Sequence, residues 1–129
     1  MKGLAETAST HELLELHLAV VTGQLEAVKF LVEEEHFNPM QRPRSGINAV
    51  HIAALNGNLQ VLKYFITERD CDPTCVGPLG ITPLHLASEQ GHLDMVRYLV
   101  IEQQIDPLCE DEYGNTALHR ACEVAVRLL

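Results

Sequence analysis

The sequence predicts an all-α solenoid, in which helix–turn–helix units of about 34 residues stack on one another and β-turn or hairpin loops project to one side. An alanine follows two residues after a histidine in every unit. Small residues at equivalent positions permit tight contacts between copies of one structural unit, so this period indicates stacked repeats. The recurring histidines are His17, His51, His85 and His119.

Glycine and proline recur at the same interval and divide each unit into parts. Glycines mark places where the backbone tolerates a positive φ, and prolines mark bends in the chain. No single unit could bury an apolar helix face alone, so stacking must bury it. The recurring residues are Gly23, Gly57 and Gly91, then Gly46, Gly80 and Gly114, and finally Pro39, Pro73 and Pro107.

Residues 80–107 form the clearest unit. Thr82 is a good N-cap and Pro83 suits the first helical position, so a short helix is expected to begin there. Gly91 suits the left-handed conformation that ends such a helix. A second helix should follow, with apolar residues at i, i+3, i+6 and i+7 on its buried face. These residues are Leu93, Val96, Leu99 and Val100.

The segment from Gly80 to Ala87 reads Gly-Ile-Thr-Pro-Leu-His-Leu-Ala and resembles an ankyrin repeat, and the resemblance covers almost the whole chain. Tetratricopeptide arrays share the period, but they lack the glycine and Thr-Pro before the first helix. Each unit is one residue longer than the usual ankyrin length of about 33, and we expect the extra residue between the second helix and the proline. The resemblance predicts one domain, residues 1–129, with units at approximately 9–45, 46–79, 80–113 and, in part, 114–129.

The two ends depart from the pattern. Ser9 and Glu12 form a capping box, so the first helix is expected to start early. At the other end, Cys122 leads straight into an apolar tail, without the turn glycine or most of a second helix. Terminal units of a solenoid need a polar outer face. We therefore expect the residues after about Ala121 to extend one helix or fray, with fast amide exchange, or to support weak self-association.

The composition indicates which classes of binding partner and which cellular compartment to expect. The net charge of −9 disfavours binding to nucleic acid or to an anionic membrane surface. The sequence has no apolar run long enough for a transmembrane helix and no secretory leader. Four cysteines without such a leader favour a reducing, cytoplasmic location. Cys75 and Cys109 occupy equivalent positions where the chain enters the turns of successive units, so we expect them to be partly exposed, and a redox role is the alternative to a structural one.

The histidines and cysteines do not form a metal site or an active site. Stacked helices lie about 8–10 Å apart, whereas the ligands of one zinc lie about 2.0–2.3 Å from the metal. Each recurring histidine is therefore expected to bond locally, to the threonine three residues earlier or to nearby backbone, as the resemblance also implies. No phosphate loop, nucleophile elbow or metalloprotease helix occurs. We predict no enzymatic activity, no cofactor and no metal.

The resemblance implies that the first helices and the turns line a concave groove, which is the expected site for a protein partner. The residues around the turn glycines differ in charge and polarity from unit to unit, whereas the recurring alanines are the same in every unit. The acidic run 110–112 lies at one turn tip, where a partner could reach it. The candidate residues are Arg42, Arg44, Ser45 and Ile47 in the second unit, Val76, Pro78, Leu79 and Ile81 in the third, Glu112, Tyr113 and Asn115 in the fourth, and Leu55, Asn56, Glu89 and Gln90 on the groove floor.

The third turn is the most informative, because four apolar residues on one turn tip are typical of a binding site. For Ile81 and its equivalent Ile47, packing between adjacent turns is an equal alternative. The sequence thus favours a protein-binding module that uses the groove. The alternative is a scaffold segment of a longer array whose partner site lies elsewhere.

Overall fold

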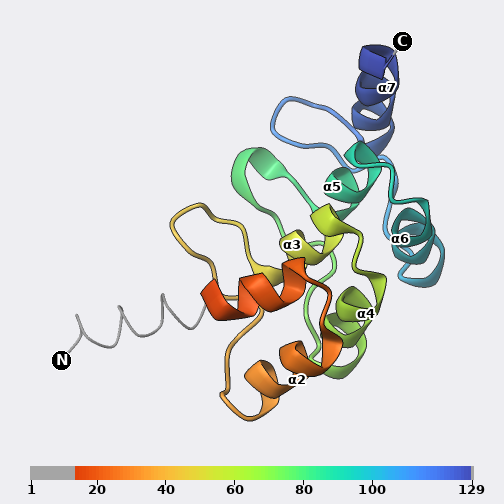
Figure 1. Cartoon of the computed structure of the whole chain (residues 1–129). Coiled ribbons are helices and arrows are strands. Elements are labelled where there is room, and N and C mark those ends of the chain that lie inside the picture. The colour runs from red at the N-terminus through yellow and green to blue at the C-terminus, as the bar shows by residue number, and fades with distance from the viewer. Residues whose placement is uncertain (1–13, 129) are drawn as a thin grey trace.

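The computed structural model describes the backbone of residues 14–128 and the side chains of residues 14–122. Within that part the chain is all helical without a β-strand, and helix pairs stack side by side (Figure 1), which confirms the predicted fold class. None of the helices described combines the length and the apolar character that crossing a bilayer requires. The helices are residues 14–21, α2 (Leu25–Glu33), α3 (Ala49–Asn56), α4 (Leu59–Glu68), η1 (Pro78–Gly80), α5 (Pro83–Glu89), α6 (Leu93–Arg97), η2 (Tyr98–Glu102) and α7 (Ala117–Leu128).

The first helix of each pair begins at the predicted polar cap. At the start of α5, Thr82 Oγ1 accepts a hydrogen bond from the His85 backbone N–H (3.3 Å), and His85 Nδ1 accepts one from the Thr82 backbone N–H (3.2 Å). Asn48 and His51 form the same reciprocal pair at the start of α3. Gly91 takes a φ of 73° just after α5. The sequence therefore predicted both ends of this helix correctly, because they depend on local chemistry.

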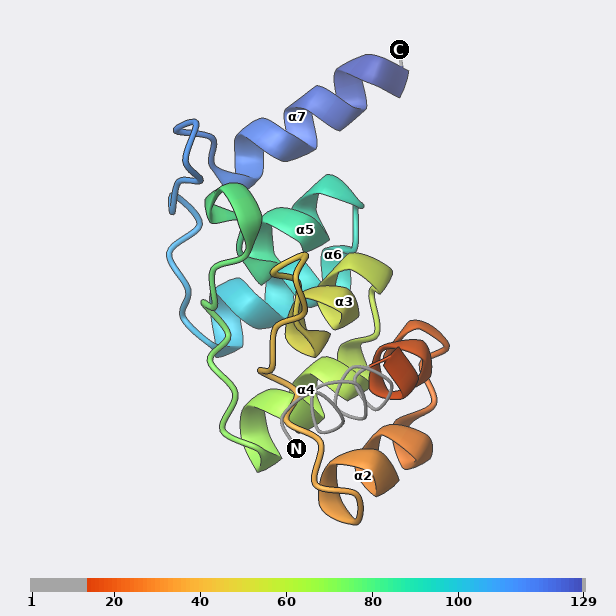
Figure 2. The same ribbon diagram turned by 90° about the vertical axis from the view of Figure 1, so that its left-hand side faces the viewer.

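Small alanines let the first helices pack tightly. Ala53 in α3 and Ala87 in α5 are both 0% exposed, and Ala19 is 9% exposed. The helices α3, α5 and α7 lie next to one another in chain order (Figures 1 and 2). This is the contact that the recurring alanines predicted.

The second helix of the third unit, α6 with its continuation η2, buries a face that agrees with the predicted one only in part. Met95 and Tyr98 are 1% and 4% exposed. Leu93, predicted to be core, is 65% exposed, so that prediction was wrong. The face toward the preceding unit is covered, whereas the face toward the C-terminal end has no second helix beside it among the described residues. Of the other predicted core residues, Leu99 is buried and Val96 and Val100 are partly buried.

The extra residue of each unit lies where the second helix ends, as the sequence predicts. Three residues at equivalent positions in successive units take a positive φ there: His36 at 60°, Asp70 at 53° and Gln104 at 55°. The residue after each donates its backbone N–H six residues back, as from Cys71 to the Phe65 carbonyl (2.9 Å). An ordinary helical bond spans four residues. The last turn is thus widened at the same point in each of the first three units.

The last helix, α7, runs on as one helix to Leu128. This is one of the two outcomes that the sequence predicts for the tail. The position at which Gly23, Gly57 and Gly91 end the earlier first helices is occupied here by Ala125. Alanine is the best helix former and disfavours a positive φ, so nothing ends the helix at that point. Ser9 and Glu12, the predicted capping box, lie outside the described residues.

Candidate functional site

Three loops join successive units and project on one side of the helices (Figure 1): the second loop, residues 34–48, the third loop, residues 69–82, and the fourth loop, residues 103–116. A Cβ atom on Gly46 would lie 3.2 Å from the Pro78 side chain, so the second and third loops touch. The Glu112 backbone N–H donates to the Leu79 carbonyl (2.9 Å), which ties the third loop to the fourth. The loop tips therefore form one row with a defined order.

The third loop presents its apolar side chains on a tight turn. Val76 is 53% exposed and Leu79 is 47% exposed, and Pro78 is also exposed. Leu79 has a φ of 60°, a conformation that is an outlier for a bulky residue. Ile81 is partly buried against the core, so the packing alternative holds for this residue.

The fourth loop is organised around Asp111, which is 6% exposed. Its carboxylate accepts hydrogen bonds from the backbone N–H groups of Tyr113 (2.8 Å) and Asn115 (2.9 Å) and from Arg120 (2.9 Å). Burial alone would raise the pKa of Asp111, but these bonds outweigh it and hold the pKa below its usual value. The prediction that a partner could reach the whole acidic run was therefore wrong for Asp111. Only its neighbours Glu110 and Glu112 are exposed.

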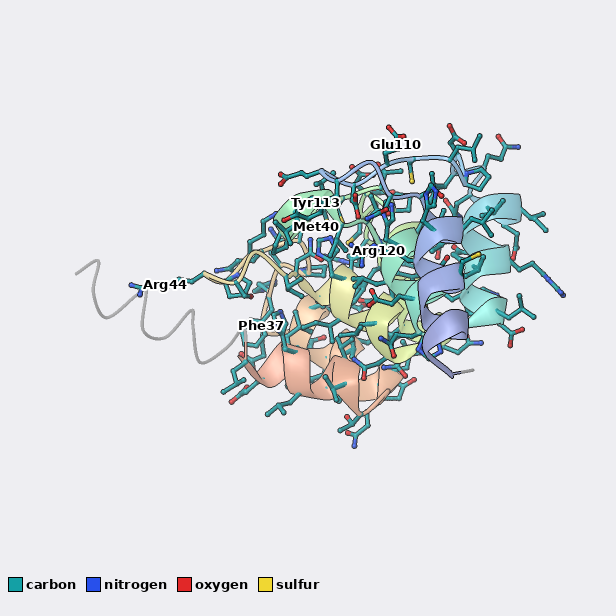
Figure 3. All side chains as sticks on the ribbon, turned by 90° about the horizontal axis from the view of Figure 1, so that it is seen from above. Phe37, Met40, Arg44, Glu110, Tyr113 and Arg120 are labelled. Carbon is teal, nitrogen blue, oxygen red and sulfur yellow. The ribbon has the colours of Figure 1, made fainter. Side chains whose placement is uncertain are left out.

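Tyr113 is the most exposed aromatic side chain among the described residues, at 70%. It lies on the fourth loop (Figure 3). Asn115, in contrast, is partly buried, and its backbone carbonyl accepts a hydrogen bond from His85 Nε2 (2.9 Å). Of the predicted residues in this loop, Tyr113 and Glu112 are open to a partner.

The second loop supplies the basic end of the row. Arg42 turns back on its own loop, where its guanidinium donates to the Gly46 carbonyl (2.7 Å). Arg44 extends outward from the loop (Figure 3), and Ser45 beside it is exposed. Ile47 is partly buried. Arg44 is therefore the freer cation of the two predicted here.

The predicted groove floor comes from the ends of α3 and α5. Leu55 is 39% exposed, and Asn56 and Gln90 are exposed. Glu89, however, forms an ion pair with Arg120 of α7 (2.9 Å). Its carboxylate is already engaged by the chain, which makes it a weaker candidate than the others. The sequence did not predict Arg120, which links Glu89 to Asp111.

The recurring histidines hold the bases of the loops. His51 Nε2 lies 3.0 Å from the Cys75 carbonyl in the third loop, and His85 Nε2 lies 2.9 Å from the Asn115 carbonyl in the fourth, at a different position of the unit. Burial lowers the pKa of His51, partly offset by its bond to the Cys75 carbonyl and reinforced by the charge of Arg42. The local bonding predicted for these two histidines is confirmed at the helix starts, where Asn48 and Thr82 are their partners, whereas the contacts with the next loop were not predicted. Among the residues described, no three His, Cys, Asp or Glu side chains come together as metal ligands would.

The cysteines are free thiols in different surroundings. Cys75, predicted to be partly exposed, is buried at 5% exposure, so that prediction was wrong, while Cys109 is partly exposed as predicted. Burial raises the pKa of Cys71 to about 11. A thiol is reactive as the thiolate, so burial disfavours reaction of Cys71 at neutral pH.

Two further side chains link neighbouring units, and the sequence did not predict them. His92 Nε2 lies 2.9 Å from the Leu55 carbonyl, at the end of the preceding first helix. Asn58, at the equivalent position one unit earlier, donates in the same way to the Val20 carbonyl. The two residues occupy the same position in successive units, which could have revealed their common role. The residue type differs between the units, however, so the sequence pattern did not stand out.

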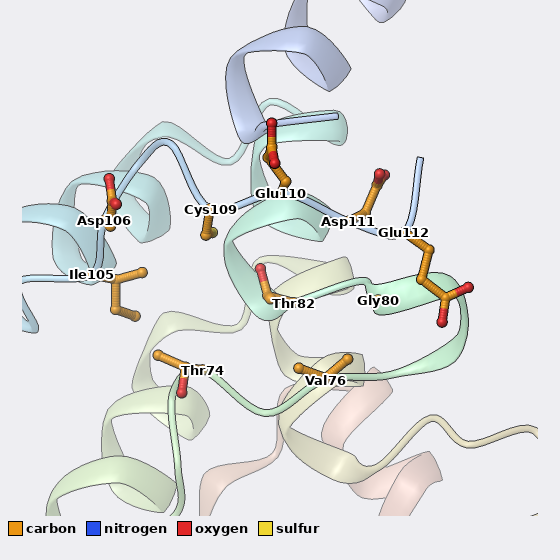
Figure 4. A pocket seen from close by; sticks show the side chains of 10 residues that line it. All are labelled: Thr74, Val76, Gly80, Thr82, Ile105, Asp106, Cys109, Glu110, Asp111 and Glu112. Atoms are coloured by element: carbon orange, nitrogen blue, oxygen red, sulfur yellow. The ribbon is translucent and has the colours of Figure 1, made fainter. Parts of the chain in front are cut away.

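A cavity of about 410 Å³ opens between the third and fourth loops (Figure 4). Val76 and Ile105 contribute apolar surface to it, and Asp106, Glu110 and Glu112 contribute carboxylates (Figure 4). Only Val76 and Glu112 belong to the predicted site. The remaining lining residues are Thr74, Gly80, Thr82, Cys109 and Asp111.

Comparison with known proteins agrees with this architecture. A family model described as ankyrin repeats (3 copies) matches residues 16–111 and residues 50–129. A comparison with curated proteins finds none that matches.

Proposed function

The chain belongs to the ankyrin repeat family, and on that premise we propose that it is a protein-binding module whose partner docks on the loop tips and the groove beside them. Ankyrin repeats are generally protein–protein interaction modules and are typically not enzymes. The narrower proposal is that this chain binds through Val76, Pro78, Leu79 and Tyr113. It includes no catalytic role, no cofactor and no nucleic-acid or membrane partner.

The observation that supports this proposal best is the exposed apolar surface of two adjacent tips. Leu79 and Tyr113 are 47% and 70% exposed, and the bond between the Leu79 carbonyl and the Glu112 N–H joins their loops. The backbone of the two loops is therefore already fixed, which lowers the cost of ordering them on binding. Leu79 also retains an unfavourable φ of 60°, and strain of this kind is common at functional sites.

Charged side chains on the two sides of this apolar centre favour a partner that carries the opposite charge at each side. Arg44 is exposed in the second loop, and Glu110 and Glu112 are exposed in the fourth. Charges at the rim of an interface act mainly on association rate and selectivity. A partner with an apolar segment between an acidic and a basic end would therefore fit best.

The test removes the apolar side chains of the two loop tips together. Replacing Leu79 and Tyr113 by alanine should weaken a partner recovered with the wild-type chain by about 2 kcal/mol or more, measured by calorimetric titration. Both side chains are largely in solvent, so the melting temperature should hardly change. Asp94→Ala, an exposed change on the second helix of the third unit, is the matched control and should bind like wild type.

A scaffold segment of a longer array is the alternative function. It predicts no loss of any partner from the Leu79 and Tyr113 changes, and equal or larger losses from changes such as Asp94→Ala. Weak self-association through the C-terminal unit is the competing use of that end of the molecule. We also take the protein to be cytoplasmic, since its four cysteines are free thiols.

A further inference from the structure

Ser45 lies at the tip of the second loop and is exposed. The turn that carries it is closed by a hydrogen bond from the Gly46 backbone N–H to the Pro43 carbonyl (2.9 Å). The Ser45 hydroxyl oxygen accepts a contact from the Ile47 backbone N–H at 3.4 Å. This distance exceeds the roughly 2.7–3.2 Å of ordinary N–H···O bonds. The hydroxyl of Ser45 is therefore held only weakly by the chain.

The exposed threonines are bonded in a way that Ser45 is not. Thr22 and Thr67 donate their hydroxyls to backbone carbonyls four residues earlier, at 3.0 and 2.7 Å. Thr74 donates its hydroxyl to the Asp72 carboxylate at 2.6 Å. The Ser45 hydroxyl donates to no group of the chain within the part that the structure describes. Ser45 thus combines an exposed side chain with a hydroxyl that is open to reaction.

Two arginines lie directly before Ser45 in an otherwise acidic protein. Arg42 is three residues before it and Arg44 one residue before it, and both are exposed. The chain has 9 lysines and arginines against 18 aspartates and glutamates, so two cations beside one hydroxyl are not a general property of its surface. Thr74, in contrast, has Asp72 two residues before it. The charge around Ser45 is therefore distinctive.

We propose that Ser45 is a phosphorylation site for a protein kinase that selects arginine on the N-terminal side of serine. Kinases distinguish substrates by their charge pattern, and a kinase of this class presents carboxylates to the two arginines. In the reaction the Ser45 hydroxyl oxygen bonds to the γ-phosphorus of ATP, the bond between that phosphorus and the β–γ bridging oxygen breaks, and ADP leaves. The hydroxyl proton passes to the catalytic aspartate of the kinase.

The second loop can enter a kinase without disturbing the core. A substrate segment lies extended in the kinase groove, so the turn at Ser45 must open. Opening it breaks the bond that closes the turn and the bond from the Arg42 guanidinium to the Gly46 carbonyl (2.7 Å). Both bonds lie at the surface, where water can replace the lost partners. None of residues 41–47 is buried, so no apolar packing is lost.

The phosphate changes the charge at the basic end of the row of loop tips. Arg42 and Arg44 supply the positive charge of the second loop tip, and a phosphate adds about −1.5 to −2 charges at pH 7. The tip becomes nearly neutral, while Glu110 and Glu112 keep the fourth loop acidic. On the proposed function, on which only this consequence rests, the modified chain no longer favours an acidic partner segment at that end.

The test treats the folded chain with ATP and a purified arginine-directed serine kinase, and follows the mass of the intact protein. We expect one phosphate per chain, located at Ser45 by fragmentation, and no phosphate at that loop in Ser45→Ala. Changing Arg42 and Arg44 to alanine together should lower kcat/KM for the kinase by at least about tenfold, since it removes the charges that the kinase selects. All three side chains are exposed, so these variants should fold.

Two controls make the result specific. Ser88→Ala alters another serine, which is partly buried, and should be phosphorylated like wild type. A free peptide of residues 39–48 should react no more than about tenfold faster than the folded chain, since the loop opens locally. The proposal is overturned if only the peptide reacts, if Ser45→Ala takes up phosphate like wild type, or if the double arginine variant reacts as fast. No partner is needed, so this outcome is separate from that of the proposed function.

Discussion

Leu84 and Leu118 occupy the same position in successive units, yet the first is 1% exposed and the second 66%. At the other end of the array, Phe30 is 54% exposed, whereas its counterparts Tyr64 and Tyr98 are 3% and 4% exposed. The residue type hardly changes along either column. What changes is whether a neighbouring unit lies on that side.

This comparison shows that burial in a stacked protein is a property of an interface between units. A unit with a neighbour on each side buries both its faces, while the first and last units of the described residues each have one face without a neighbouring unit. In such an array stability is approximately a sum of unit and interface contributions. The same side chain can therefore stabilise the fold in one unit and remain available for binding in another.

Paired truncations should give the largest difference. Leu84→Ala removes a buried side chain and should lower the free energy of unfolding by about 2–5 kcal/mol. Leu118→Ala removes a mostly solvated one and should change it by less than about 0.5 kcal/mol. Urea denaturation of both variants measures the difference. Equal losses would mean that Leu118 is covered in solution.

Enlarging the recurring alanine should give a smaller difference. Ala87→Leu overpacks the contact between first helices and should cost about 1–3 kcal/mol. Ala121, at the same position in α7, is only partly buried, so Ala121→Leu should be tolerated. If Ala87→Leu is as stable as wild type in thermal unfolding, Ala87 is not at a tight contact.

The pH dependence should be the smallest of these effects. Burial lowers the pKa of His51 and of His17. The unfolded chain binds a proton at each near pH 6.5, while the folded chain resists it, so stability should fall as the pH drops below about 6.5. Melting temperatures at several pH values test this, and His51→Gln should reduce the slope. A melting temperature that rises on acidification would contradict the assignment.

Features that are local or strictly periodic could be predicted from the sequence. The cap at Thr82, the left-handed Gly91 and the packing of Ala87 each depend on one residue type in a repeated place. The extra residue of each unit could be located for the same reason. The exposure of Leu93 could not be predicted from its helical spacing, because it depends on whether a second helix lies beside it.

The candidate site was predictable only in outline. The exposure of Leu79 and Tyr113 agrees with a turn tip. The burial of Asp111 was missed because it depends on Arg120, which lies on another element, and no other unit has this pair. Because this pair occurs in one unit only, a comparison of the units with one another cannot reveal it.

The widened turn at His36, Asp70 and Gln104 has a consequence for how the array could be altered. Because every unit carries its additional residue at the same point, all loops are displaced together and the row of tips stays in phase. Removing Gln104 alone would shift the fourth loop against the third and pull the Asn115 carbonyl away from His85. Length changes in this protein are therefore compatible with the array when they are made in every unit, and they disrupt it when they are made in one.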